Sequence, residues 1–221
     1  MNKIVPAFKT SLFDTSLSDV CVEIAELGID SILDNDILKS LPICNLLVGV
    51  GKTAQNIYDR NLLNQTIKFI NTFNKKSIPQ KKLEKYKKRL NNNSKYAEEE
   101  LGRVIILLNS NIDLEKSELL GKFYASYVNE EIDWKEFREL SDITSRLFLS
   151  DLSALYKIYN REIVDTAQFQ TYIADRLIAL GVISSEIKFK EKETRNVMDG
   201  QIIRSVQVSR RGELFCKISL S

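Results

Sequence analysis

The stretch "LLVGVGKT", residues 46–53, decides between two folds for this chain. It ends in Gly-Lys-Thr, as a phosphate-binding loop does, and such a loop would indicate an α/β nucleotide-binding protein. A phosphate loop also needs a glycine where this sequence has Leu46, whose side chain would obstruct the tight turn. The preceding residues 37–45 contain Pro42 and make a poor central strand. The sequence therefore disfavours nucleotide binding through Gly51, Lys52 and Thr53.

The same stretch fits a helix packed inside a bundle. We predict one continuous helix over residues 42–58, in which Gly49 and Gly51 allow a neighbour to approach closely. Between residues 41 and 51 only Asn45 is polar, which raises membrane insertion as an alternative. A spanning helix needs roughly 20 apolar residues, and Lys52 ends this run earlier. The run 41–51 could then act only as an interfacial or pore-lining segment released from a folded body.

The composition predicts a mainly α fold. Glycine (8) and proline (3) are scarce, and 43% of the residues are hydrophobic, as expected for a packed core with short loops. Apolar residues recur at helical spacing through most of the first 160 positions, including residues 17–32 and 114–128. We therefore expect a helical bundle domain over residues 1–160. Residues 1–13 show no clear period and are interpreted as a loosely held arm.

Local signals place several helix ends. Ser77 and Pro79 begin a basic helix, and "NNNS" at 91–94 ends it. The next helix is expected to carry Glu98, Glu99 and Glu100 in its first turn, where the helix dipole favours acids. Asp133 with Glu136 resembles a capping box that starts a further helix.

The pattern changes near residue 162. The segment "TAQFQTYIADRLIALGVI" predicts an amphipathic helix that ends at Gly181. Alternating "EIKFKEKE" and "QIIRSVQV" predict a β-hairpin, and Ser209 is expected to cap a short last helix. Residues 161–221 are thus predicted to form a C-terminal winged-helix-like α/β module of helix, β-hairpin and short helix.

The residue types leave little for catalysis. Histidine is absent, which removes the commonest general base and metal ligand. Cys21, Cys44 and Cys216 have no partners at metal-ligand spacing and are expected to be reduced and buried. We predict no enzyme activity, no cofactor and no metal site. No signal peptide begins the sequence, so the expected location is the cytoplasm.

Charge is distributed unevenly along the chain. Residues 75–95 hold nine lysines or arginines against Glu84 alone, a net charge of +8, while the whole chain carries +2. Such a segment can bind phosphate backbones or a protein partner, although it lacks clustered arginines that read bases. The predicted hairpin and last helix add further basic side chains. The candidate nucleic-acid or partner surface consists of Lys81, Lys82, Lys85, Lys88, Arg89, Lys188, Lys190, Arg210 and Arg211.

The layout also carries a family resemblance. A helical body with "IYDRNLLNQTIKFI", followed by a tail with "RLIALGVI" and "VSRRGELF", resembles small, mostly uncharacterised bacterial and prophage proteins. It is similar in layout to the abortive-infection alpha group, which implies a role in phage defence or prophage conflict. The leading hypothesis is a non-enzymatic cytoplasmic interaction protein that binds a protein partner or itself. The alternatives are a winged-helix DNA-binding regulator and a membrane-active effector that uses residues 41–51.

Overall fold

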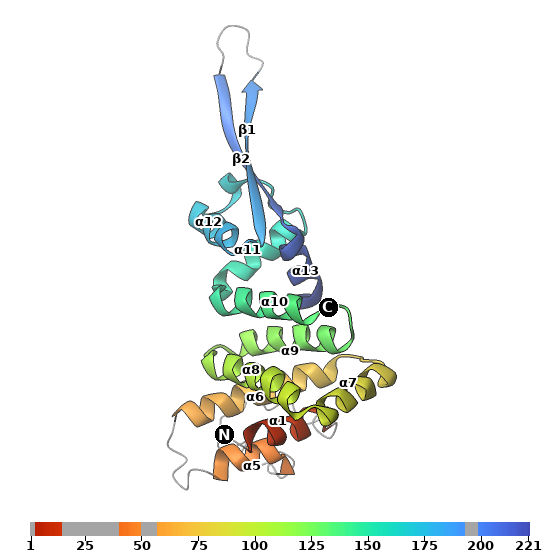
Figure 1. Cartoon of the computed structure of the whole chain (residues 1–221). Helices are drawn as coiled ribbons and strands as arrows, with labels where there is room; N and C mark the ends of the chain where they lie inside the picture. The colour runs from red at the N-terminus through yellow and green to blue at the C-terminus, as the bar shows by residue number, and fades with distance from the viewer. Residues whose placement is uncertain (1–2, 15–39, 50–56, 193–198) are drawn as a thin grey trace. The chain divides into compact units, whose positions relative to one another are not determined.

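A computed structural model describes residues 3–14, 40–49, 57–192 and 199–221 (Figure 1). The chain divides into two compact units, Met1–Ser145 and Arg146–Ser221, and each is described by itself. The sequence-based boundary at 160/161 places the helix Leu149–Tyr159 with the first unit, whereas the structure groups it with the second. The predicted helix over residues 17–32, Cys21 and the Gly51-Lys52-Thr53 triplet lie outside the described residues.

The first unit is helical throughout its described residues. Its helices are α1 (Ile4–Leu12), α5 (Pro42–Gly49), α6 (Ile57–Lys75), α7 (Gln80–Asn92), α8 (Ser94–Ser110), α9 (Leu114–Val128) and α10 (Trp134–Arg146). The core gathers around α6 and α9, where the rings of Phe69 and Phe73 lie 5.5 Å and 5.9 Å from the ring of Tyr124. Gly121 permits this approach, because a Cβ there would lie 2.9 Å from the carbonyl oxygen of Phe69.

The structure corrects the expectation of a loose N-terminal arm. Residues 4–12 form helix α1, which buries Val5, Phe8 and Leu12. Phe8 packs on Phe69 of α6, with the ring centroids 5.9 Å apart. These apolar residues have helical spacing, so a short amphipathic helix was readable in a segment that we interpreted as irregular.

The stretch over residues 46–53, which decides between the two folds, begins inside a helix. Helix α5 starts at Pro42, as predicted, and Leu46 lies within it rather than at the end of a strand. Leu41, Ile43 and Cys44 are buried, which fits a helix packed inside a bundle. The predicted continuity over residues 42–58 stays a prediction, because residues 50–56 are outside the described part.

The second unit combines helices with one antiparallel hairpin. Its elements are α11 (Leu149–Tyr159), the 3-10 turn η2 (Thr166–Gln168), α12 (Thr171–Ala179), β1 (Ile183–Lys192), β2 (Asp199–Val208) and α13 (Arg210–Ser219). The strands pair in register from Ile183 opposite Val208 to Lys192 opposite Asp199. A short bridge joins Asp165 to Ser205 at the base of the hairpin. The prediction of a mainly α protein with a C-terminal hairpin is therefore confirmed.

Two caps predicted from the sequence hold this unit. Gly181 has a φ of +71° just after α12, a conformation that glycine adopts without strain. The Ser209 hydroxyl accepts a hydrogen bond from the Gly212 amide at 3.0 Å and so caps α13. Gly212 packs tightly, since a Cβ there would lie 1.8 Å from the Val182 carbonyl oxygen.

Candidate functional site

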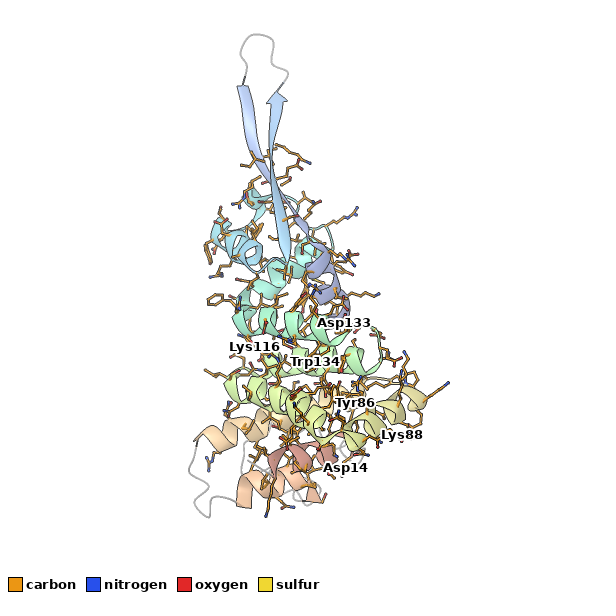
Figure 2. All side chains as sticks on the ribbon, in the orientation of Figure 1. Asp14, Tyr86, Lys88, Lys116, Asp133 and Trp134 are labelled. Carbon is orange, nitrogen blue, oxygen red and sulfur yellow. The ribbon has the colours of Figure 1, made fainter. Side chains whose placement is uncertain are left out.

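A pocket of about 500 Å³ opens in the first unit beside α7. Four aromatic side chains line it, which are Tyr86, Tyr96, Tyr127 and Trp134. Its basic lining residues, Lys82, Lys85 and Arg89, all come from α7, and we call them the α7 wall. Its acidic lining residues are Glu130, Glu131, Asp133 and Glu136, and we call them the acidic wall. Figure 2 labels Tyr86 on α7 and Asp133 and Trp134 at the start of α10.

Tyr86, Tyr96 and Tyr127 form what we call the floor of the pocket, and this floor lies over a buried carboxyl group. Glu100 of α8 is 2% exposed, and both of its oxygens accept hydrogen bonds from tyrosine hydroxyls. Tyr86 donates to Oε1, Tyr124 donates to Oε1 at 3.3 Å, and Tyr127 donates to Oε2 at 2.8 Å. Because a buried carboxyl group is costly without such donors, these contacts explain how Glu100 is accommodated in the core.

Arg89 occupies a cage of three tyrosine rings above this floor. Its guanidinium carbon lies 5.0 Å, 4.7 Å and 5.6 Å from the ring centroids of Tyr86, Tyr96 and Tyr127. Its Nη2 donates to the Tyr127 hydroxyl at 2.5 Å and lies 3.7 Å from Oε2 of Glu100. The arginine is therefore held by cation–π contacts and by charge, although about half of its side chain is exposed.

The surroundings keep the tyrosines protonated. Burial, followed by the nearby Tyr124 and Glu100, raises the pKa of Tyr86 well above its ordinary value. Burial and Glu100 likewise raise the pKa of Tyr124, and burial raises the pKa of Tyr96 to about 12. Hydroxyls of this kind donate hydrogen bonds but are poor bases or nucleophiles near neutral pH. The cluster is thus suited to holding groups in place rather than to proton transfer.

The two walls are joined to each other at the pocket edge. The Lys82 ammonium donates to the backbone oxygen of Asn129 and, at 3.2 Å, to its Oδ1. The Lys85 ammonium lies 2.6 Å from Oε1 of Glu130, and this ion pair lowers the pKa of Glu130. The pair is largely exposed, so it contributes little to stability and can exchange partners.

The acidic wall is built by the start of α10. The Asp133 carboxyl accepts from the Glu136 amide at 2.8 Å, and Glu136 accepts from the Asp133 amide at 3.0 Å, which confirms the predicted capping box. The cap places Trp134 at the first helical position, where its ring stacks on Phe137 at 5.0 Å. Trp134 also lies 5.2 Å from the ring of Tyr127.

The structure separates the basic residues predicted on α7 into two sets. Lys82, Lys85 and Arg89 line the pocket, whereas Lys81 and Lys88 are exposed and do not belong to the pocket lining. Lys88 is labelled on α7 in Figure 2.

The basic residues predicted in the tail lie in the second unit. Lys188 is on β1, where its ammonium lies 3.2 Å from Glu186. Lys190 is paired with Gln201 in the strand register, and its side chain is outside the described part. Arg210 is exposed at the start of α13, and Arg211 beside it is half-buried.

Sequence reasoning missed Glu100. We expected Glu98, Glu99 and Glu100 in the first turn of a helix, but α8 begins earlier, at Ser94, with Asn93 accepting from the Tyr96 amide at 2.9 Å. That start moves the three acids out of the first turn, and Glu100 falls on the buried face. The sequence signal that could have shown Glu100 to be buried was its helical spacing from Ala97 and Val104, which are buried on the same face of α8.

Two of the cysteines lie in the core. Cys44 and Cys216 are buried, as predicted. Burial raises the pKa of Cys216 to about 12, which disfavours the thiolate. Across the described ranges there is no group of three or more His, Cys, Asp or Glu side chains arranged to hold a metal ion.

Comparisons with protein-family models, with curated proteins and with solved structures found no match for this chain. The class of the protein therefore has to be argued from its own pocket and surfaces. In the part of the chain that the structure describes, no helix is both long and apolar enough to cross a bilayer.

Proposed function

We propose that this chain is a non-enzymatic interaction protein whose pocket in the first unit receives a segment of a protein partner. The observation that carries the proposal is the aromatic floor, in which Glu100, the tyrosine hydroxyls and Arg89 hold one another in fixed positions. A floor with this internal network is preorganised, so a ligand need not order it on binding. Tyrosine, tryptophan and arginine are also the residues that most often dominate binding interfaces.

The pocket has the dimensions and chemistry of a side-chain receptor. Its volume of about 500 Å³ suits a few side chains of a bound segment. Both charge signs line it, which supports a polypeptide ligand over a nucleic acid, because a phosphate backbone would meet the acidic wall.

A peptide selection tests the proposal. The full chain is used to select binders from a random peptide library, and the dissociation constant of a selected peptide is measured by the fluorescence of Trp134, the only tryptophan. We expect Lys82→Glu with Lys85→Glu in the α7 wall to weaken binding more than tenfold, because these lysines hold Asn129 and Glu130 and so position the acidic wall. The matched control is Lys81→Glu with Lys88→Glu, outside the pocket, which should leave binding within twofold. Failure to select any peptide, or equal effects of both pairs, would contradict the proposal.

We also propose that the protein acts in phage defence, because its sequence resembles the abortive-infection alpha group in layout. Cells that express the wild-type chain should resist some phages better than cells that express the Lys82→Glu, Lys85→Glu variant. Plaque counts across a phage panel give the measurement. Equal plaque counts for both strains on every phage would remove the support for this setting.

DNA binding is the second candidate, and the arrangement of the second unit favours it. The order α11, bridge, η2, α12, hairpin and α13 resembles that of a winged-helix domain, and this resemblance supports the candidate. Two residues of α12 argue against DNA binding. Asp175 is exposed, so it would repel a phosphate backbone, and Arg176 is already paired with Asp151. The lysines of α7 would supply further phosphate contacts from the first unit. A salt-dependent gel shift that is lost when Lys81, Lys82, Lys85 and Lys88 become Glu would favour this candidate, and no shift at low salt would end it.

Membrane action through residues 41–51 is the third candidate. It requires Leu41, Ile43 and Cys44 to leave the core in which they are buried. Leakage of dye from anionic liposomes on addition of the full chain is the test. Intact liposomes at micromolar protein would remove this candidate and leave the proposed interaction function standing.

A further inference from the structure

We infer that the pocket receives a basic side chain, an arginine or lysine of the partner polypeptide, seated on Trp134 beside the acidic wall. The inference rests on the proposed function and specifies its ligand. The charged residues that line the pocket are three cations and four acids, a formal sum of −1. The Glu100 carboxyl group lies directly beneath the floor. The electrostatic field of the pocket therefore favours a cation.

The cations of the α7 wall are already engaged within the chain. Lys82 holds Asn129, and Lys85 holds Glu130. Arg89 holds the Tyr127 hydroxyl and lies close to Glu100. An anionic ligand on this wall would have to replace these partners, whereas a cationic ligand on the acidic wall leaves them in place.

The acidic wall retains acceptor capacity. Glu131 is exposed, and its Oε1 accepts from the Asn129 amide at 2.6 Å. Asp133 is exposed, and its Oδ1 accepts from the Glu136 amide. A carboxylate offers about four acceptor positions, so each of these groups can also accept from an incoming ammonium or guanidinium.

Trp134 supplies an aromatic surface in the same pocket lining as these acids. Its ring is fixed from one side by stacking on Phe137, with an interplanar angle of 18°, and it remains partly exposed in the pocket lining. Tryptophan is the strongest aromatic partner for a cation. An indole ring held in place in a pocket that also carries carboxylates suits a guanidinium or ammonium group.

The chain itself provides a precedent in the same pocket. Arg89 already lies over three aromatic rings with a carboxyl group close behind. This contact shows that rings and an acid together hold a guanidinium here. The partner's side chain would repeat the arrangement on Trp134 with Glu131 and Asp133.

Fluorescence of Trp134 provides the experiment. The full chain is titrated with N-acetyl-argininamide, with the neutral isostere N-acetyl-citrullinamide, and with an anionic N-acetyl-aspartate derivative. We expect a saturable change with the arginine probe that weakens as salt is added, and at least tenfold weaker binding of citrulline. Free N-acetyl-tryptophanamide controls for quenching without a site.

Two matched variants test the acidic wall. Glu131→Gln removes one exposed carboxylate and should weaken the arginine probe about threefold, in line with the usual size of an exposed charge contact. Glu98→Gln, an exposed acid of α8 outside the pocket lining, should have no effect. Asp133 is not substituted, because it caps α10.

The outcomes separate the inference from the proposed function. Equal binding of arginine and citrulline, or binding of the anionic probe alone, would overturn the inference. In that case a selected peptide that still depends on Lys82 and Lys85 would keep the proposed function. If no probe binds and no peptide is selected, both fail.

Discussion

Nη2 of Arg89 lies 3.7 Å from Oε2 of Glu100, and the same nitrogen donates to the Tyr127 hydroxyl that donates to this carboxyl oxygen. A half-exposed cation is thereby connected to a buried acid both directly and through one hydroxyl. Burial alone would lower the pKa of Arg89, but its electrostatic interactions with Tyr127, Tyr96 and Glu100 outweigh burial and raise that pKa. Arg89 thus links the surface of the pocket to its buried floor.

Arg89→Ala should destabilise the first unit and leave a cage that fits a free guanidinium ion. The buried carboxyl group loses its cationic partner, and because Arg89 is half-exposed we expect a loss of about 1–2 kcal/mol in unfolding free energy. Methylguanidinium at low millimolar concentration should restore part of the melting temperature. Thermal unfolding with and without the ion gives the measurement.

The control for this rescue is Arg138→Ala, an exposed position on α10. It should change neither the melting temperature nor its response to methylguanidinium. Rescue of both variants to the same extent would show a general solvent effect and would count against the cage.

Alkaline pH should unfold the first unit through its tyrosines. The folded pKa values of Tyr86 and Tyr124 lie well above the unfolded value of about 10. The stability that this shift provides is complete below the unfolded pKa and is lost as pH rises towards the folded pKa. We expect the free energy of unfolding to fall above pH 10, by on the order of 1 kcal/mol per pH unit for each buried tyrosine.

Tyr86→Phe checks this pH dependence. The variant lacks one titrating hydroxyl, so the slope of unfolding free energy between pH 10 and 12 should be shallower than in the wild type. Tyr159→Phe, in α11 of the other unit, should leave that slope unchanged. Urea unfolding at a series of pH values gives the slopes, and identical slopes for all three proteins would exclude the tyrosine cluster as the cause.

Local signals predicted the ends of elements well. The Asp133–Glu136 box, the Ser209 cap and the Gly181 stop each depend on a few neighbouring residues, so their chemistry is visible in sequence. The hairpin follows from period-two alternation. These features place Trp134 and the acidic wall at the start of α10.

The floor of the pocket was not predictable in the same way. Tyr86, Tyr96 and Tyr127 come from three helices, and their meeting depends on how α7, α8 and α9 pack. Each tyrosine alone is typical of an ordinary core position. Only packing around Glu100 converts them into a polar cluster, and a misplaced helix start hid that residue.

Gly121→Ala and Gly102→Ala should change stability in opposite directions. Both glycines lie inside helices of the first unit, but a Cβ at Gly121 would lie 2.9 Å from Phe69 O and Thr72 Cβ. That crowding should cost about 1–3 kcal/mol. Among the described residues, a Cβ at Gly102 would meet no atom within 4 Å outside its own helical turn, so the change should stabilise by up to about 1 kcal/mol. Chemical denaturation measures both, and equal signs would show that α6 and α9 do not pack this closely.

Asp151→Ala should lower the melting temperature of the second unit more than any substitution of an exposed residue in that unit. Asp151 is fully buried, and Arg176 binds it through two contacts, Nε to Oδ2 at 2.8 Å and Nη2 to Oδ1 at 2.5 Å. The rings of Phe148 and Tyr172 lie 4.5 Å and 4.7 Å from the guanidinium carbon and hold it in place. Removing the acid loses both contacts to Arg176 and leaves a space in the core where the Asp151 side chain was buried, so the melting temperature of the second unit should fall.

Arg176→Lys distinguishes shape from charge at this pair. Lysine keeps the positive charge but cannot make both contacts or lie flat between Phe148 and Tyr172. We therefore expect Arg176→Lys to lose most of the stability that Asp151→Ala loses, and the double variant to lose less than the sum of the two. Calorimetric unfolding of the full chain measures all three. Full stability in Arg176→Lys would mean that charge alone holds α11 to α12, and the two-contact geometry would then have no role.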